Sequence, residues 1–324
     1  MKWLLLSLAG VMSILMCWMV LISIRWAPRR SSPQIVQYKP YSLVKCPVVI
    51  SETERREYVE SSSKEIPKII YQSYIPNSEE ELSDSMKQAM NSFKVLNPDY
   101  SHKYFGDDAA LQILIDNFGN DSDEVFAFRN LIPGAFKIDF WRYAMLWLFG
   151  GFYADADMML LEPFEKWISP NSTFVIPLEK IGFGFHNGFI GSVPKHPILR
   201  IAMDMVIYNV KTKFLPRVPN KIIPAVHADL AVSGPILLGK VMNRYINEPD
   251  EVKHNIPLLR SKNVQVIGFC ANNKNDDDTY YTVSLSQECT GTKLAKVKFE
   301  QFQKEHATKT ESYTKLFQER KVFL

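Results

Sequence analysis

Two carboxylates stand one residue apart in an otherwise apolar segment, FGGFYADADMMLLEPF at residues 149–164. Asp155 and Asp157 follow the pair Gly150-Gly151, which ends the preceding element, and the run after the glycines is expected to be a strand. Because successive side chains of a strand point to opposite faces, this alternation places both carboxylates on one face. Two like charges in a half-buried strand need a partner, and hard oxygen ligands suit Mg2+ or Mn2+. The pattern therefore predicts a divalent-cation site.

A helix is expected directly before these aspartates. It follows Pro133-Gly134, covers residues 135–148 and carries apolar side chains at helical spacing. Asp139 and Arg142 are three residues apart on it, so they are neighbours and can pair. Most such pairs are solvated surface contacts without function. The position of this helix, which runs straight into the aspartate segment, favours instead one cleft shared by all four charged side chains.

The segments that precede this helix alternate between strand and helix. Strands are expected at residues 66–74 and 100–105, and helices at 79–96 and 108–118. This alternation is typical of an α/β domain with a mostly parallel sheet covered by helices. The chain has 324 residues, of which 46% are hydrophobic, which is enough for one large domain. A net charge of +3 argues against a nucleic-acid partner, because a dedicated nucleic-acid binder needs a concentrated basic face.

The N-terminus carries an uncharged apolar run, residues 3–24, that is long enough to cross a bilayer. We predict an uncleaved transmembrane anchor at residues 1–25, followed by a polar, proline-punctuated stem at residues 26–64. A cleaved signal peptide is the alternative, but the run is long for one and no small-x-small cleavage site follows it. Three arginines behind the run would place the body in the cytoplasm by the positive-inside rule: Arg25, Arg29 and Arg30.

The run KIDFWRYAMLWLFGGFYADADM, residues 137–158, resembles the sugar-binding region with the D-x-D motif of a known glycosyltransferase family. That family includes yeast initiating α-1,6-mannosyltransferases, inositol-phosphoceramide mannosyltransferases and α-1,4-galactosyltransferases. Its pattern is an Asp, two residues, Arg-Tyr, a helical stretch, Gly-Gly, an aromatic residue and D-x-D. The matching residues are Asp139, Arg142, Tyr143, Gly150, Gly151, Tyr153, Asp155 and Asp157. Agreement in spacing as well as in residue type is specific, whereas a lone D-x-D would be weak.

The resemblance extends to both sides of this run. IPKIIYQSY, residues 66–74, resembles the opening strand of the family, with Tyr71 where a His is usual. Further similar segments are NPDYSHKYFGDD at residues 97–108, HNGFIGSVPKHPIL at residues 186–199 and SGPILL at residues 233–238. Together they cover roughly residues 66–240, a span large enough for a whole catalytic domain.

The resemblance implies a GT-A fold, a single nucleotide-binding α/β domain, which we expect at residues 65–290 with a C-terminal helical extension at 291–324. It implies that Asp155 and Asp157 hold a metal, Mn2+ or Mg2+, that bridges the diphosphate of a nucleotide sugar. The other donor-binding residues that it implies are Gln72, Ser73, Asp139, Arg142 and Asn187. The predicted catalytic set is Asp139, Arg142, Asp155 and Asp157.

Several other polar residues are open to more than one interpretation. Asn187-Gly188 is also a strong signal for a turn, and this is compatible with a role of Asn187 in the cleft. No nucleophile is assigned, and Asp204 and Asp229 are unranked candidates. Three histidines are expected to be structural or to lie on the surface, since no pair shows metal-ligand spacing: His186, His196 and His227.

We therefore predict a metal-dependent retaining glycosyltransferase that moves a hexose, with mannose ranked first, from GDP-mannose or a UDP-hexose to a glycan or glycolipid acceptor such as a sphingolipid. The alternatives are an α-galactosyltransferase that uses UDP-galactose and a non-catalytic, membrane-anchored protein that binds sugar nucleotides. A phosphatase or phosphotransferase with an aspartyl nucleophile is disfavoured, because its motif needs Thr or Val where this chain has Met159.

The location of the body depends on the same resemblance. Relatives with one N-terminal anchor have a lumenal Golgi domain, and we expect that location here despite the arginines. In a lumen, Cys270 and Cys289 would form a disulfide, and two free thiols are the alternative. The sequons at Asn120 and Asn171 matter only in that compartment.

Overall fold

The computed structural model describes residues 65–74, 77–179, 184–215, 225–271, 279–306 and 313–324. The anchor expected at residues 1–25 and the stem expected at 26–64 lie outside these ranges. Within the ranges, none of the helices combines the length and the hydropathy that a membrane span requires.

A nine-stranded mixed sheet forms the centre of the described body, with the strand order β2-β1-β3-β6-β5-β7-β8-β9-β4. The strands are β1 (Ile69–Ser73), β2 (Ser101–Phe105), β3 (Gly151–Ala154), β4 (Met158–Leu160), β5 (Phe174–Glu179), β6 (Phe189–Ser192), β7 (Val264–Ala271), β8 (Thr279–Ser284) and β9 (Lys293–Phe299). The predicted α/β class is confirmed, but the prediction of a mostly parallel sheet is wrong. Among the described strands only β1–β2, β1–β3 and β5–β7 pair in parallel. The strand–helix alternation that favours parallel pairing ends in the C-terminal third, where β7, β8 and β9 pair antiparallel and the described residues between them form no helix.

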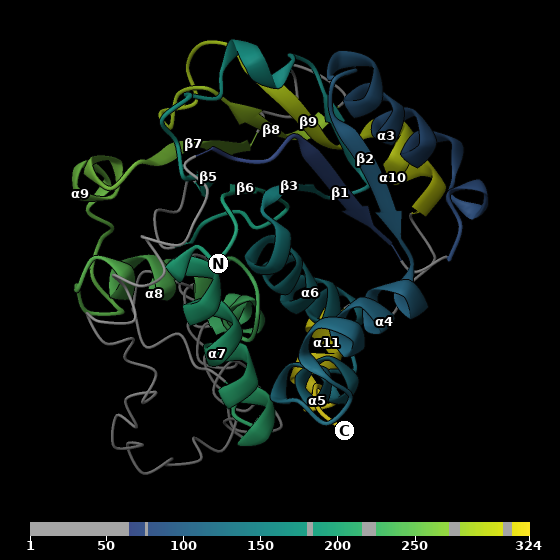
Figure 1. The fold of residues 1–324 in the computed structure, drawn as a ribbon, viewed down its shortest axis with the longest axis vertical. Helices are drawn as coiled ribbons and strands as arrows, with labels where there is room; N and C mark the ends of the chain where they lie inside the picture. The colour runs from purple at the N-terminus through teal and green to yellow at the C-terminus, as the bar shows by residue number, and fades with distance from the viewer. Residues whose placement is uncertain (1–64, 75–76, 180–183, 216–224, 272–278, 307–312) are drawn as a thin grey trace, which may run out of the picture. The chain divides into compact units, whose positions relative to one another are not determined.

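Helices cover both faces of this sheet (Figure 1). Helices α3 (Asp84–Leu96) and α10 (Glu300–His306) lie on one face. The other face carries α4 (Asp107–Phe118), α5 (Asp123–Asn130), α6 (Gly134–Phe149), α7 (Pro197–Lys211), α8 (Pro235–Tyr245) and α11 (Tyr313–Gln318). Helix α9 (Ile256–Ser261) precedes β7, and short 3-10 helices occur at η1 (Glu79–Glu81), η2 (Phe164–Lys166) and η3 (Ala225–Ala231).

The alternation of side chains along the strands creates two separate cores. In β3, Tyr153 packs into the core with the larger set of helices, whereas its neighbour Phe152 packs into the core that contains Phe93 of α3. The same split occurs in β5 between Ile176 and Val175. Apolar side chains therefore cover both faces of the sheet. This leaves the ends of the strands for the polar residues singled out in the sequence.

Helix α6 and the following glycines position the aspartate segment. The helix runs from Gly134 to Phe149, within one residue of the predicted range 135–148 at each end, and Gly150 is its C-cap. Gly150 has φ +64°, and a Cβ there would lie 2.7 Å from Pro194 Cδ and 2.9 Å from Pro67 Cδ. The chain therefore reverses here through a position that only glycine fits.

The two aspartates lie in a turn, so the prediction that a strand carries both of them is wrong. Strand β3 ends at Ala154, and the turn is closed by a hydrogen bond from Met158 N to Asp155 O of 3.0 Å. The physical reason is that aspartate disfavours strand interiors and favours turns.

This turn joins two strands that are far apart in the sheet order. Strand β3 is third and β4 is ninth, a separation of roughly 29 Å in a flat sheet with strands about 4.8 Å apart. The three residues that connect them span at most roughly 14 Å. The sheet must therefore curl until its last strand returns to the middle.

The segment 291–324 differs from the predicted helical extension. It begins with β9, which pairs with β8 and β4, before α10 and α11 follow. Leu294 and Val297 of β9 are buried in the core beside α3, so this part of the chain belongs to the sheet.

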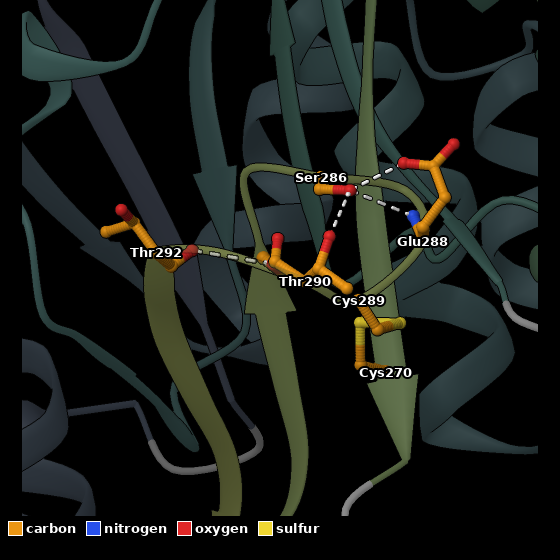
Figure 2. The surroundings of a disulfide bond; sticks show 7 residues. Cys270, Ser286, Glu288, Cys289, Thr290 and Thr292 are labelled. Atoms are coloured by element: carbon orange, nitrogen blue, oxygen red, sulfur yellow. Dashed lines mark hydrogen bonds between the residues drawn. A yellow bond between two sulfur atoms is a disulfide. The ribbon is translucent and has the colours of Figure 1, made fainter.

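A disulfide joins Cys270 of β7 to Cys289, with Cα atoms 5.7 Å apart (Figure 2). Cys289 lies in the loop between β8 and β9, where Ser286 Oγ accepts hydrogen bonds from Glu288 N at 3.1 Å and Thr290 Oγ1 at 3.3 Å. Of the two alternatives left open for these cysteines, the structure has the disulfide.

Candidate active site

The Asp155 carboxylate is held by one oxygen. Tyr153 donates its hydroxyl proton to Asp155 Oδ1 at 2.9 Å, and Arg142 Nη2 lies 3.2 Å from the same oxygen. The Asp155 carbonyl oxygen accepts a hydrogen bond from Gln72 Nε2 at 3.3 Å. These contacts come from β1, β3 and α6, so three elements fix the direction in which the second oxygen, Oδ2, points.

Arg142 lies between Asp139 and Asp155 and contacts both carboxylates. Its guanidinium donates to Asn187 O at 2.6 Å, lies 3.3 Å from Asp139 Oδ1 and stacks on the Tyr153 ring at 4.3 Å. Arg142 and Asp139 are only 5% and 9% exposed. The pair is therefore no solvated surface contact, and it lies together with Asp155.

Asp139 is bound on both carboxylate oxygens. Asn187 Nδ2 donates to Oδ1 at 2.7 Å and Ser233 Oγ donates to Oδ2 at 2.8 Å. Burial raises the pKa of Asp139 to about 6, against the opposing effect of Arg142. Asn187 also donates to the Tyr143 hydroxyl at 3.0 Å. Asn187 therefore lies in a turn, and hydrogen bonds also hold its side chain in the site.

Asp157 lies in an environment that disfavours its negative charge, and a bound cation would offset this effect. Its Oδ1 is buried and makes no hydrogen bond. Burial, followed by the charge of Asp155, raises the pKa of Asp157 to about 7. A buried carboxylate oxygen without a partner is costly, and a divalent cation beside it would remove that cost. Within the described ranges, however, no three His, Cys, Asp or Glu side chains converge to hold a metal. The residues fit a cation whose coordination is completed by oxygen atoms of a ligand.

Gln72 and Ser73 bond within the protein. Gln72 is fully buried, and its Oε1 lies 2.6 Å from His102 Nε2 while its amide reaches Asp155. Ser73 donates its hydroxyl proton to Phe105 O at 2.7 Å. Gln72 therefore orients the aspartate turn, and a direct contact of either residue with a nucleotide stays a prediction.

The remaining residues named in the sequence analysis make contacts with other parts of the chain or are not described. Asp204 pairs with Arg200 on α7, and Arg200 in turn lies 2.9 Å from Glu124. Asp229 accepts a hydrogen bond from Thr314 of α11 at 2.6 Å. His196 is structural, because its Nδ1 accepts from Ile198 N at the start of α7. The His227 side chain lies outside the described residues.

His186 lies beside the site, and its expected structural role stays a prediction. Its side chain is 13% exposed, and its Nδ1 lies 4.0 Å from Glu179 Oε1. Burial lowers the pKa of His186 to about 4 and raises the pKa of Glu179 to about 7. Sequence reasoning also missed Ser233 and the Tyr143 hydroxyl as partners of this network, although both residues stand in segments that carry the resemblance.

The comparisons with known proteins find the family that the sequence resembles. Residues 83–174 match the family model described as "Glycosyltransferase sugar-binding region containing DXD motif". That segment includes Asp139, Arg142, Asp155 and Asp157.

Three relatives illustrate the similarity. The initiation-specific alpha-1,6-mannosyltransferase of Saccharomyces cerevisiae is 37% identical over 79 residues, which are 24% of this chain and 16% of the relative. An uncharacterized glycosyltransferase of Acanthamoeba polyphaga mimivirus is 31% identical over 134 residues, 41% of this chain and 52% of the relative. Inositol phosphoceramide mannosyltransferase 1 of Schizosaccharomyces pombe is 27% identical over 199 residues, 60% of this chain and 57% of the relative.

The chain thus spans little more than half of these relatives at most. The resemblance drawn from the sequence is confirmed: residues 83–174 match the glycosyltransferase sugar-binding region that contains the DXD motif.

Proposed function

We propose that this protein is a metal-dependent retaining glycosyltransferase that transfers a hexose, mannose in the first place, from a nucleotide sugar to a glycan or glycolipid acceptor. One observation carries the proposal. Asp155 is fixed through Oδ1 by Tyr153 and Arg142, while the neighbouring Asp157 keeps a buried oxygen without a partner. The preference for mannose rests on the two relatives that are mannosyltransferases.

In this proposal Asp155 and Asp157 hold the divalent cation. When bound, the cation supplies positive charge against the negative charge that develops on the departing nucleoside diphosphate. Arg142 and Tyr153 keep the Asp155 carboxylate in one orientation, so no reorganisation is needed when the donor binds. Asp139 and Asn187 form the wall beside them that contacts the donor sugar. Gln72 holds the aspartate turn through its backbone.

We further propose the GT-A arrangement for the body, with an anchor at residues 1–25 and a lumenal Golgi location. The Cys270–Cys289 disulfide supports a lumenal body, because disulfides persist in oxidising compartments. The predicted sequons support it as well, since Asn120 and Asn171 are both exposed.

The test is a screen of sugar nucleotides with the full-length chain, produced in a secretory host and solubilised in detergent. Hydrolysis and transfer are measured with GDP-mannose, UDP-galactose and UDP-glucose, with Mn2+ and with a chelator. We expect turnover of GDP-mannose that needs the metal and falls by about 100-fold or more in Asp155→Ala.

Asp204→Asn is the matched control, because this carboxylate is bound to Arg200, which also pairs with Glu124, and it makes none of the contacts described for Asp139 and Asp155. Activity that persists in the chelator, or that Asp155→Ala leaves intact, contradicts the proposal. Metal-dependent binding of a donor without any turnover would instead identify a non-catalytic sugar-nucleotide-binding protein.

A further inference from the structure

The second oxygen of Asp155 and one nitrogen of His186 border the same small space. A Cβ built on Gly188 would lie 2.4 Å from Asp155 Oδ2 and 2.5 Å from His186 Nε2. Gly188 is not among the glycines with positive φ in the described residues, so its backbone does not require glycine. Glycine is required here for room, because any side chain would fill the space that both atoms face.

The His186 ring is fixed so that Nε2 faces this space. The ring stacks on Phe269 of β7 at 3.7 Å with an interplanar angle of 10°, and Phe269 stacks in turn on Tyr281 of β8. On the opposite edge of the ring, Nδ1 faces Glu179. A carboxylate behind one ring nitrogen favours the tautomer with the proton on that nitrogen and leaves a lone pair on the other.

His186 Nε2 nevertheless has no hydrogen-bond partner, although it is buried. The atom it faces across the space, Asp155 Oδ2, also presents lone pairs. A buried nitrogen acceptor that faces a carboxylate oxygen is unfavourably placed unless a positively charged or proton-donating group lies between them. Imidazole nitrogen and carboxylate oxygen are both accepted by Mn2+ and related cations.

Resting on the function proposed above, we infer that His186 is a ligand of the divalent cation at Asp155, through Nε2. Diphosphate oxygens of the donor supply the remaining coordination, and Asp157 joins them once the donor is bound, because in the described ranges these side chains do not yet converge as a three-residue cluster. Glu179 and Phe269 act as positioning residues, because they hold the imidazole without touching the cation. The cation site thus includes a nitrogen ligand that the two aspartates alone do not indicate.

The test measures the ligand directly, by pulsed electron paramagnetic resonance of Mn2+ bound to the full-length chain in the presence of GDP or UDP. We expect the echo modulation of a directly bound 14N nucleus, which changes to that of 15N when the protein is labelled with 15N-histidine. This measurement on the unmutated chain does not depend on whether a variant folds.

Two variants localise the nitrogen to His186. In His186→Ala the nitrogen modulation is lost, and the dissociation constant of Mn2+ rises at least about 10-fold. In Gly188→Ala the imidazole remains but the space is filled, so the same two changes are expected. His196→Asn is the control, since this buried histidine caps α7 and Asn is an equally good cap; both signals stay unchanged there.

The outcomes separate this inference from the proposed function. If Asp155→Ala abolishes Mn2+ binding while the unmutated chain shows no histidine nitrogen, the inference is overturned and the proposed function stands. If His186→Ala weakens binding of GDP-mannose but leaves the nitrogen modulation intact, His186 contacts the donor and not the metal, which also overturns the inference. If Asp155→Ala leaves Mn2+ binding unchanged, the proposed function itself fails.

Discussion

At the scale of single residues, the site is a network of buried polar groups in which most atoms have partners. Both oxygens of Asp139 and one oxygen of Asp155 are hydrogen-bonded or ion-paired. Two buried atoms without a partner, Asp157 Oδ1 and His186 Nε2, lie beside the second oxygen of Asp155 or follow it in the same turn, and a third, His102 Nδ1, lies behind Gln72. The two unpaired atoms nearest Asp155 mark a place where a ligand can complete the structure.

Cation affinity is expected to depend on pH through Asp157. Burial and the charge of Asp155 raise the pKa of Asp157 to about 7 in the free protein. The cation binds the ionised carboxylate and must displace the proton below that pH, so its affinity falls as pH falls from 8 to 6, by at most about 10-fold per pH unit for one proton. Isothermal titration with Mn2+ across this range measures the effect. Asp157→Asn removes the titrating group and should flatten the profile; an equally steep profile in that variant would contradict the assignment.

At the scale of elements, the site depends on how α6 and β3 are joined. The extent of α6 could be predicted closely, because Pro133, the apolar spacing and Gly150 all mark it in the local sequence. The turn that carries Asp155 and Asp157 could not, since the alternation of residues fits a continuous strand equally well. The position of His186 was also inaccessible, because Phe269 and Glu179 reach it only through the pairing of β5 with β7.

Two glycines at helix ends provide a matched test of this junction. Gly119 and Gly150 follow α4 and α6, and both have positive φ. A Cβ at Gly119 meets nothing within 4 Å, whereas a Cβ at Gly150 collides with Pro194 and Pro67. Gly119→Ala is expected to cost only the backbone strain of about 1–3 kcal/mol, and Gly150→Ala about 1–3 kcal/mol more for the collision. Urea unfolding measures both, and equal losses would show that the contacts at Gly150 yield freely.

The disulfide joins β7 to the loop between β8 and β9, and it stabilises the fold mainly by constraining the unfolded chain. Replacing both Cys270 and Cys289 by Ser is expected to lower the free energy of unfolding by about 2–4 kcal/mol. Thermal unfolding with and without reductant measures this loss. The reductant should lower Tm in the unmutated chain and have no effect on the double variant. A reductant effect of the same size in both would assign the stabilisation to something else.

At the scale of the whole molecule, the described body is built on one curled sheet. The order of its strands cannot be predicted from local sequence patterns. Strand–helix alternation predicts the first strands and helices well. It cannot show that β4 pairs with β9, because these strands are separated by more than a hundred residues and only the closed sheet brings them together. The same holds for segment 291–324, whose interspersed aromatic residues fit a packed helix as well as a buried strand.

The proposed lumenal location of the body leads to a cellular prediction. Asn120 and Asn171 are exposed and lie outside helices and strands, so both are accessible to glycosylation if the body is lumenal. We expect endoglycosidase to increase the gel mobility of the cellular protein, and Asn120→Gln and Asn171→Gln each to remove one step of the shift. A protein without glycans would instead agree with the cytoplasmic location that the arginines after the apolar run favour.

The curl of the sheet has a consequence for the order of events during synthesis. The DXD turn leads into β4, and β4 finds its strand partner only in β9, which leaves the ribosome more than a hundred residues later. All residues of the motif are therefore synthesised long before the strand that pairs with β4. Until β9 docks, β4 lacks its ladder, and the two carboxylates lack the framework that sets their separation. We expect the nascent chain to gain cation affinity last, so that a ribosome stalled before residue 293 would hold every recognisable motif and no metal site.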